Sequence, residues 1–139
     1  MSIEIHVFMQ DARVPSRDEW QQAIAQLGFP TVLCPTLDVR ADTGFSPTTY
    51  KAQRTGFEFD VSPAADVLSS YPHVAAAVGN RDRCATFRWG GDLTECAAAL
   101  SAAAALVKVT DGLYFYPDDD TVLGADDAVE ALRSDLASM

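Results

Sequence analysis

Alternating polar and apolar positions, enriched in β-branched and aromatic residues, predict several β-strands along the chain. Within residues 56–61, Phe57 and Phe59 occupy one face of the predicted strand. Glu58 and Asp60 occupy the opposite face, because successive side chains of a strand point to opposite sides. The predicted strands are residues 3–9, 30–35, 46–51, 56–61, 84–89, 113–116 and 121–123.

The segment before the predicted hairpin has the composition of a loop. Residues 37–47 contain Asp, Gly and Pro but no hydrophobic period. We expect the strands at 46–51 and 56–61 to pair as a hairpin, with residues 52–55 as the connection.

Apolar residues spaced three and four apart predict helices between these strands. Ser16 is followed by Glu19, and Asp92 by Glu95, which is the spacing of a capping box at a helix start. Ser62 precedes a proline, and this pair predicts a further short helix. The predicted helices are residues 16–28, a short segment from 62, residues 72–79, 92–107 and 125–137.

The order of these elements predicts the fold class. Residues 92–107 have small side chains on all sides, so we expect this helix to lie close to a sheet as the central buried helix. Strands and helices interleave irregularly, which predicts an α+β fold with a single mixed or mainly antiparallel sheet and helices packed on it. The length predicts a single globular domain that spans residues 1–139.

The charge of the chain is concentrated near its C-terminal end. The formal net charge is −10. Residues 92–139 contribute −8 of it, because their ten acidic residues are opposed only by Lys108 and Arg133. An acidic field repels phosphate backbones and anionic lipid and attracts basic partners, so we expect no nucleic-acid partner.

Other features of the sequence predict the cellular compartment of the protein. The first ten residues lack a basic segment followed by an apolar run, so we expect no signal peptide. The most apolar stretch, residues 96–107, is too short to span a membrane. The chain has an odd number of cysteines, and their spacing does not match a metal site. This pattern is typical of reduced thiols, and the three residues are Cys34, Cys84 and Cys96. We expect a cytoplasmic protein with no cofactor, no metal and no membrane partner.

Three adjacent aspartates, Asp118, Asp119 and Asp120, follow the aromatic strand at residues 113–116. A calcium loop of the EF-hand type requires alternating oxygen ligands, a central glycine and a late glutamate, and this pattern is missing. Asp118 and Asp120 alone could still share a magnesium ion. The sequence Pro-Asp-Asp-Asp is typical of a turn in which side chains cap backbone groups, and we expect the turn.

A second group of charged residues lies on predicted strands. Glu58 and Asp60 could hold a metal or divide acid and base roles. Such a row is also typical of the solvated face of a half-buried sheet. Arg88 precedes a glycine pair and a helix start, where anions often bind, but Asp92 at the cap would repel a phosphate. We expect Arg88 to pair with Glu58 or Asp60 if their strands are neighbours.

The two histidines give no metal-binding pattern. His6 and His73 have no Cys or acidic residue at a ligand spacing. His6 lies on the strand face opposite Ile5 and Val7. A Cys–His nucleophile pair remains an alternative, because residues distant in sequence can be neighbours in the fold.

Three segments, "GFEFDVSP", "ATFRWGGDL" and "DGLYFYPDDDTVLGADDAVE", resemble small uncharacterised bacterial proteins, some of which are similar to immunity proteins of polymorphic or contact-dependent toxin systems. The resemblance covers about residues 44–135. It implies a single cytoplasmic domain that binds a cognate toxin and has no active site. Because these motifs are structural, the resemblance assigns no functional residue.

Together these observations predict an acidic binding protein that docks a basic protein partner and blocks it. The resemblance implies that this partner is a toxin domain. The expected contacts are Asp118, Asp119, Asp120, Asp126, Asp127 and Glu130.

Two alternatives belong to other classes of function. One is a small enzyme or ligand-binding domain with a site around Glu58, Asp60 and Arg88, to which His6 could contribute. The other is a structural or assembly subunit. The sequence leaves the order of the strands and the oligomeric state open.

Overall fold

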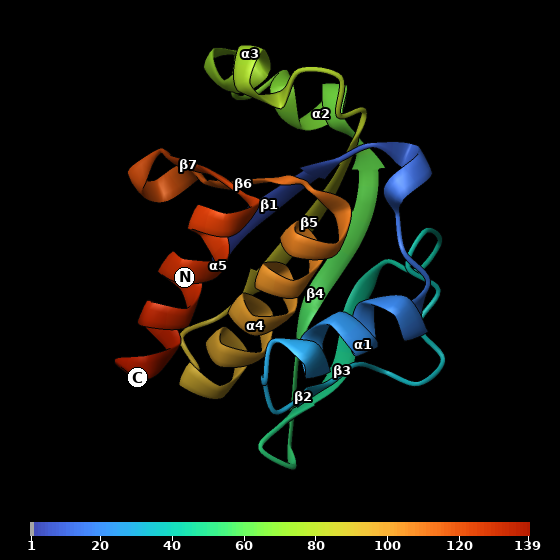
Figure 1. Cartoon of the computed structure of the whole chain (residues 1–139), viewed down its shortest axis with the longest axis vertical. Coiled ribbons are helices and arrows are strands. Elements are labelled where there is room, and N and C mark those ends of the chain that lie inside the picture. The colour runs from blue at the N-terminus through green and yellow to red at the C-terminus, as the bar shows by residue number, and fades with distance from the viewer. Residues whose placement is uncertain (1) are drawn as a thin grey trace.

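A seven-stranded antiparallel sheet forms the centre of the fold, and helices pack against both of its faces (Figure 1). The computed structural model describes residues 2–139. The strands are β1 (Ile3–Met9), β2 (Thr31–Val32), β3 (Gly44–Tyr50), β4 (Gln53–Pro63), β5 (Arg83–Trp89), β6 (Leu113–Tyr116) and β7 (Thr121–Gly124). The α-helices are α1 (Arg17–Gln26), α2 (Ala64–Leu68), α3 (Ala75–Val78), α4 (Leu93–Thr110) and α5 (Ala125–Ala137). Three short 3-10 helices are η1 (Asp11–Arg13), η2 (Pro72–Val74) and η3 (Pro117–Asp119).

The strand order is β2-β3-β4-β5-β1-β6-β7, and every neighbouring pair is antiparallel. This arrangement confirms the predicted α+β class with helices packed on an antiparallel sheet. β1 lies between β5 and β6, so the first strand of the chain pairs with two strands from its second half.

The helix α1 begins as its sequence predicts. The N–H of Glu19 donates to Ser16 Oγ at 3.1 Å, and the N–H of Ser16 donates to Glu19 Oε1 at 2.9 Å, which completes the capping box. Gly28 follows the helix with φ of 81°, a conformation that favours glycine. The buried Trp20 joins α1 to the core, because its Nε1–H donates to the carbonyl oxygen of Ala102 in α4 at 2.9 Å.

The alanine-rich α4 is the central helix on the face of the sheet that also carries α1 and α5, as predicted (Figure 1). Asp92 caps it by accepting from the N–H of Glu95 at 3.0 Å. The reciprocal half of the predicted capping box is not formed, since Glu95 Oε1 instead accepts from the N–H of Gly90 at 3.3 Å. The helix continues to Thr110, past the predicted end at 107, and a left-handed residue, Asp111, terminates it. Its length and hydropathy would also suit a membrane span, but 67% of it is buried inside the fold.

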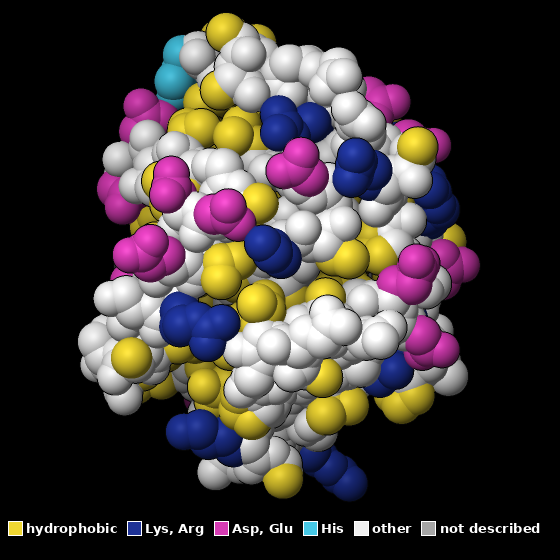
Figure 2. Space-filling model, in the orientation of Figure 1, with side chains coloured by type: hydrophobic (Ala, Val, Ile, Leu, Met, Phe, Trp, Pro, Cys, Tyr) yellow, Lys and Arg dark blue, Asp and Glu magenta, His cyan; other side chains and the backbone are white. Residues whose placement is uncertain are grey.

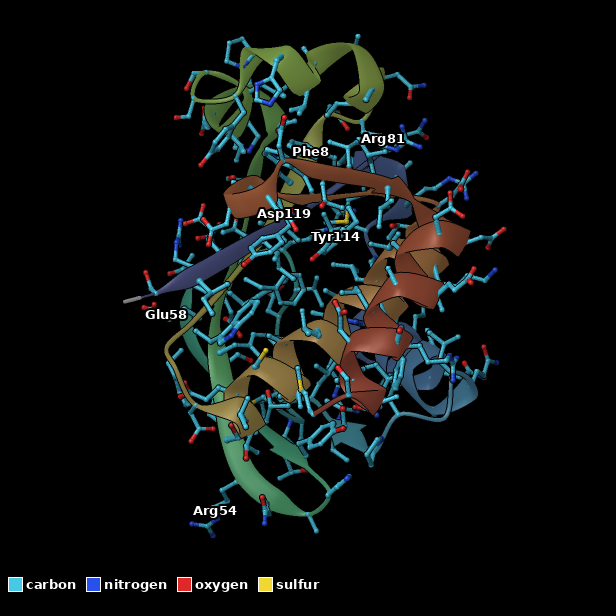
Figure 3. All side chains as sticks on the ribbon, turned by 90° about the vertical axis from the view of Figure 1, so that its left-hand side faces the viewer. Phe8, Arg54, Glu58, Arg81, Tyr114 and Asp119 are labelled. Atoms are coloured by element: carbon cyan, nitrogen blue, oxygen red, sulfur yellow. The ribbon has the colours of Figure 1, made fainter. Side chains whose placement is uncertain are left out.

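The sheet separates two hydrophobic clusters of unequal size. The larger cluster lies between the sheet and α1, α4 and α5, and it includes Val7 and Tyr114. The smaller one includes Phe8 and Phe115 and is covered by the lobe of α2, η2 and α3, which we call the helical lobe. In Figure 3, Phe8 and Tyr114 accordingly lie on opposite sides of the sheet.

Three local predictions are wrong. The strand predicted at 30–35 is confined to Thr31–Val32. Residues 37–47 are not all loop, because β3 begins at Gly44. The hairpin turns at Lys51 and Ala52 rather than over 52–55, and both residues have positive φ, 50° and 63°. A two-residue turn of this kind usually contains glycine or asparagine, so its sequence signal was missing.

The predicted helix start at Ser62 is also wrong. β4 continues through Pro63, and Ser62 lies opposite Cys84 in the β4–β5 ladder. Helix α2 begins at Ala64 and has no side-chain cap. The strand pairing outweighs the local preference of serine for a helix cap.

The tight packing of α4 predicts that a larger side chain cannot be accommodated there. Ala103 is completely buried, and we expect Ala103→Leu to lower the free energy of unfolding by about 1–3 kcal/mol through overpacking. Ala25→Leu, at an exposed position of α1, is the matched control and should have little effect. Urea denaturation of both variants measures the difference. Equal stability of the two variants would contradict close packing around α4.

Candidate functional site

The face of the sheet opposite α4 carries most of the predicted ligand-site residues. Glu58 and Asp60 point to this face, as their spacing predicts, because Phe57 and Phe59 are buried on the other side. Figure 3 shows Glu58 on the side of the sheet away from α4 and α5. Arg88 is directly opposite Glu58 in the β4–β5 ladder.

Arg88 connects two carboxylates on this face. Its Nε donates to Glu4 Oε2 at 2.8 Å, and its Nη1 lies 3.6 Å from Asp60 Oδ2. The predicted pairing of Arg88 across the sheet is confirmed for Asp60. The shorter contact is with Glu4 on β1, which the sequence did not indicate, because β1 and β5 are separated by about 80 residues.

His6 lies beneath this network and is 1% exposed. Its Nδ1 is 2.9 Å from Thr86 Oγ1, within hydrogen-bond distance. Its Nε2 is 2.9 Å from Glu4 Oε1, but the direction of approach does not meet hydrogen-bond geometry, so among the described residues Nε2 has no directed partner. Burial lowers the pKa of His6 and Glu4 partly opposes this effect, so we expect the ring to be neutral near pH 7.

Cys84 and His6 are neighbours, with 3.7 Å between Sγ and Nδ1. The thiol is completely buried between the sheet and the helical lobe. Burial raises its pKa well above the ordinary value. The fold therefore assembles a Cys–His pair but keeps its sulfur protonated and out of contact with solvent, which makes it a poor nucleophile.

A cavity of about 350 Å³ opens over this network, and we call it the sheet-face pocket. The sheet supplies its floor, and the helical lobe supplies one wall. The residues that line it are Glu4, His6, Asp60, Ser62, Asp66, Val67, Ser70, Tyr71, Thr86 and Arg88. Glu58 does not line it. Sequence reasoning missed Asp66 and Tyr71, since only the placement of the lobe brings them to the sheet.

The acidic residues predicted to contact a partner lie together in a different region. Asp118, Asp119 and Asp120 belong to the turn between β6 and β7, and the other three lie in the first half of α5. We call this set of six residues the acidic edge: Asp118, Asp119, Asp120, Asp126, Asp127 and Glu130. All six are exposed, and in Figure 2 acidic side chains gather at the left over β7 and α5.

Two members of the acidic edge are paired with neighbouring side chains. Asp120 accepts from His73 Nε2 at 2.7 Å, and Asp126 accepts from Lys108 Nζ at 3.0 Å. Asp119 accepts from the N–H of Thr121, as expected for a turn. Across residues 2–139 no three His, Cys, Asp or Glu side chains are placed together to hold a metal ion.

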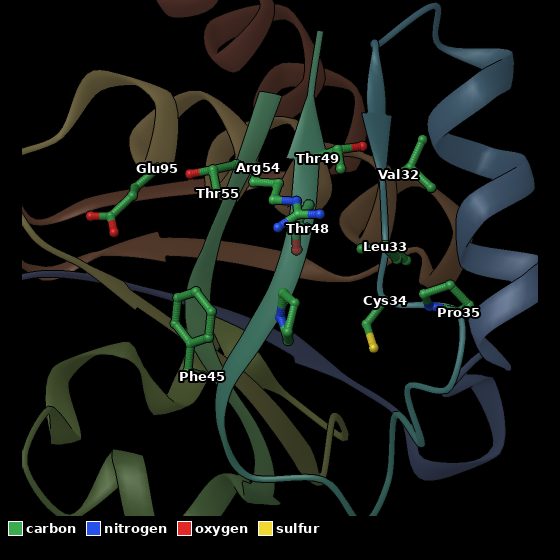
Figure 4. Close-up of a pocket in the computed structure, with 11 residues that line it drawn as sticks. Val32, Leu33, Cys34, Pro35, Phe45, Thr48, Thr49, Arg54, Thr55 and Glu95 are labelled. Atoms are coloured by element: carbon green, nitrogen blue, oxygen red, sulfur yellow. The ribbon is translucent and has the colours of Figure 1, made fainter. Parts of the chain in front are cut away.

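A larger groove of about 640 Å³ follows the outer edge of β3 (Figure 4). β2 pairs only with Thr49 and Tyr50, so within the described sheet the first half of β3 is an open edge. Phe45 is 60% exposed there, and its ring lies over Gly56, where a Cβ atom would be 2.5 Å from it. Pro47 has no N–H to offer, which is typical of edges that are protected against pairing with other strands.

No protein-family model, curated protein sequence or solved structure matches this chain. The resemblance to immunity proteins therefore remains a prediction from the sequence.

The three thiols are expected to react at very different rates. Hydrogen bonding with Thr36, at 3.5 Å, lowers the pKa of the accessible Cys34, whereas burial raises the pKa of Cys96 and Cys84. We expect iodoacetamide to label Cys34 first, Cys96 more slowly and Cys84 only after unfolding. Mass spectrometry of timed samples, with urea-unfolded protein as the control, tests this order. Early labelling of Cys84 in the folded protein would contradict its burial.

The lowered pKa of His6 predicts a pH-dependent loss of stability. Below its ordinary pKa of 6.5, the unfolded chain binds a proton at His6 that the folded chain does not bind. The free energy of unfolding should therefore decrease as the pH falls from 7 to 5. His6→Asn removes this titration and should flatten the dependence. Urea midpoints across this range compare the two proteins, and parallel curves would rule out a contribution from His6.

Proposed function

We propose that this chain is a protein-binding domain that docks a basic partner through its acidic edge and blocks that partner, in the manner of an immunity protein. The observation that supports this proposal is the group of exposed carboxylates without a cationic partner. In residues 2–139, Asp118, Asp119, Asp127 and Glu130 have no cationic group within 4.0 Å.

Charge complementarity would act mainly on the rate and specificity of association. A carboxylate that is already paired inside the chain adds little to the field that a partner meets, whereas unpaired carboxylates act at a distance. Their placement on a turn and on a helix of the same edge gives them a rigid scaffold. A basic toxin domain is the partner that the sequence resemblance implies.

The proposal predicts association that depends on charge at one edge. The partner is first identified by capturing it from the host lysate on the tagged chain. The rate of association is then measured with the purified partner. We expect Asp127→Asn with Glu130→Gln to slow association several-fold and to reduce its dependence on salt. The matched control is Gln22→Lys with Gln26→Lys, which changes the net charge by the same amount on the exposed surface of α1.

Equal association rates for the edge variant and the control variant would overturn the acidic edge as the docking surface. Salt-independent binding would overturn the electrostatic argument as a whole. A partner that is captured but whose activity is unchanged by binding would refute the inhibitory part of the proposal.

The sheet-face pocket supports a second candidate function, which is the binding of a ligand. The specific observation is that four polar side chains from three strands, Glu4, His6, Asp60 and Arg88, meet at one cavity. Of the residues predicted for such a site, Asp60 and Arg88 line the cavity, and Glu58 lies beside it on the same face.

A further inference from the structure

We infer that the sheet-face pocket binds a cationic nitrogen group, an ammonium or a guanidinium, carried either by a basic side chain of a protein or by a small amine. This inference rests on the second candidate function and names the chemical class of its ligand. It does not depend on docking at the acidic edge.

The charges of the pocket favour a cation. Glu4, Asp60 and Asp66 line it, and Arg88 is the only cationic side chain in its lining, so the pocket carries −2 when His6 is neutral. The guanidinium is already held by two of these carboxylates, at 2.8 Å and 3.6 Å. The field that remains attracts a further cation and repels an anion.

A buried atom in the floor also indicates a ligand. The imidazole of His6 is almost completely buried, and in the described chain its Nε2 is 2.9 Å from Glu4 Oε1 but has no partner with hydrogen-bond geometry. The carboxylate of Glu4 favours the ring proton on Nε2 as long as Oε1 stays 2.9 Å away. If the proton moves to Nδ1, facing Thr86, Nε2 presents a lone pair to the pocket. A cationic N–H group that draws Glu4 Oε1 toward itself can donate a second hydrogen bond to that lone pair.

The shape of the pocket suits a basic group on an aliphatic stem. Its volume of about 350 Å³ is near the lower end of small-ligand sites. Tyr71 forms part of the wall, and its ring lies 6.1 Å from that of His6. An aromatic wall binds the methylene stem of a lysine or arginine and also stabilises its charge.

Direct titration of the full chain tests the inference. The probes are N-acetyl-lysine methylamide, N-acetyl-arginine methylamide and putrescine, and the uncharged control is N-acetyl-norleucine methylamide. Calorimetry measures affinity, while ¹⁵N NMR of the imidazole reports which ring nitrogen of His6 carries the proton. We expect one-to-one binding of a charged probe, with a shift of the His6 resonances toward the Nδ1–H tautomer. Preference for a capped amino acid over putrescine would indicate a protein side chain, and the reverse preference a free amine.

Two variants localise the binding. Asp60→Asn and Asp66→Asn should each weaken the preferred probe about tenfold, the order expected for loss of one charge-assisted hydrogen bond. Asp127→Asn changes the net charge equally at the distant acidic edge and should leave the affinity unchanged. Because Asp66 is exposed on α2, its variant keeps the test valid even if Asp60→Asn unfolds the chain.

Three results would overturn the inference: no binding of any charged probe at millimolar concentrations, equal weakening by Asp127→Asn, or binding without a change at His6. None of them bears on partner docking, which is measured separately through variants of α5. Conversely, loss of partner docking with intact amine binding would leave the inference about the pocket unchanged, and it would bear only on the role of the acidic edge in docking.

Discussion

The close contact between α4 and the sheet is the constraint on which the rest of this structure depends. Alanine residues on all sides of α4 let it lie against the strands and against two other helices at once. α1 is held to it through the hydrogen bond from Trp20 to the carbonyl of Ala102. β2 is held through Thr31, whose hydroxyl is 2.6 Å from that of Ser101. A bulkier helix would separate these elements and remove both contacts.

The same packing determines where polar chemistry can occur. One face of the sheet is covered by α4 and its neighbouring helices, so charged side chains of the central strands must point to the other face. There the helical lobe covers only part of the sheet. Polar groups next to the lobe are partly shielded from water, which strengthens their mutual interactions and alters the pKa of His6. The pocket therefore arises at the boundary between the covered and uncovered parts of this face.

Local patterns in the sequence predicted the helices and strands themselves far better than they predicted which of these elements lie side by side in the fold. The face of each strand, the capping box of α1 and the buried nature of α4 follow from residues that are close in sequence. The insertion of β1 between β5 and β6 does not, because no local signal specifies pairing over such distances. That insertion brings Glu4 and His6 to Arg88, and the contact of Arg88 with Glu4 was therefore not predicted. The turn at Lys51 and Ala52 was missed because neither residue is typical of positive φ.

The position of β1 also has a consequence for how the chain is made. Both partners of the first strand lie far along the sequence, the nearer beginning at Arg83 and the farther ending at Tyr116. During synthesis, β1 emerges from the ribosome before either partner and keeps two open edges until both have followed. Non-local pairing of this kind slows folding and leaves apolar strand edges available to other chains. The period between the synthesis of β1 and that of β6 is thus when this protein is most exposed to aggregation, and when it would benefit most from a chaperone.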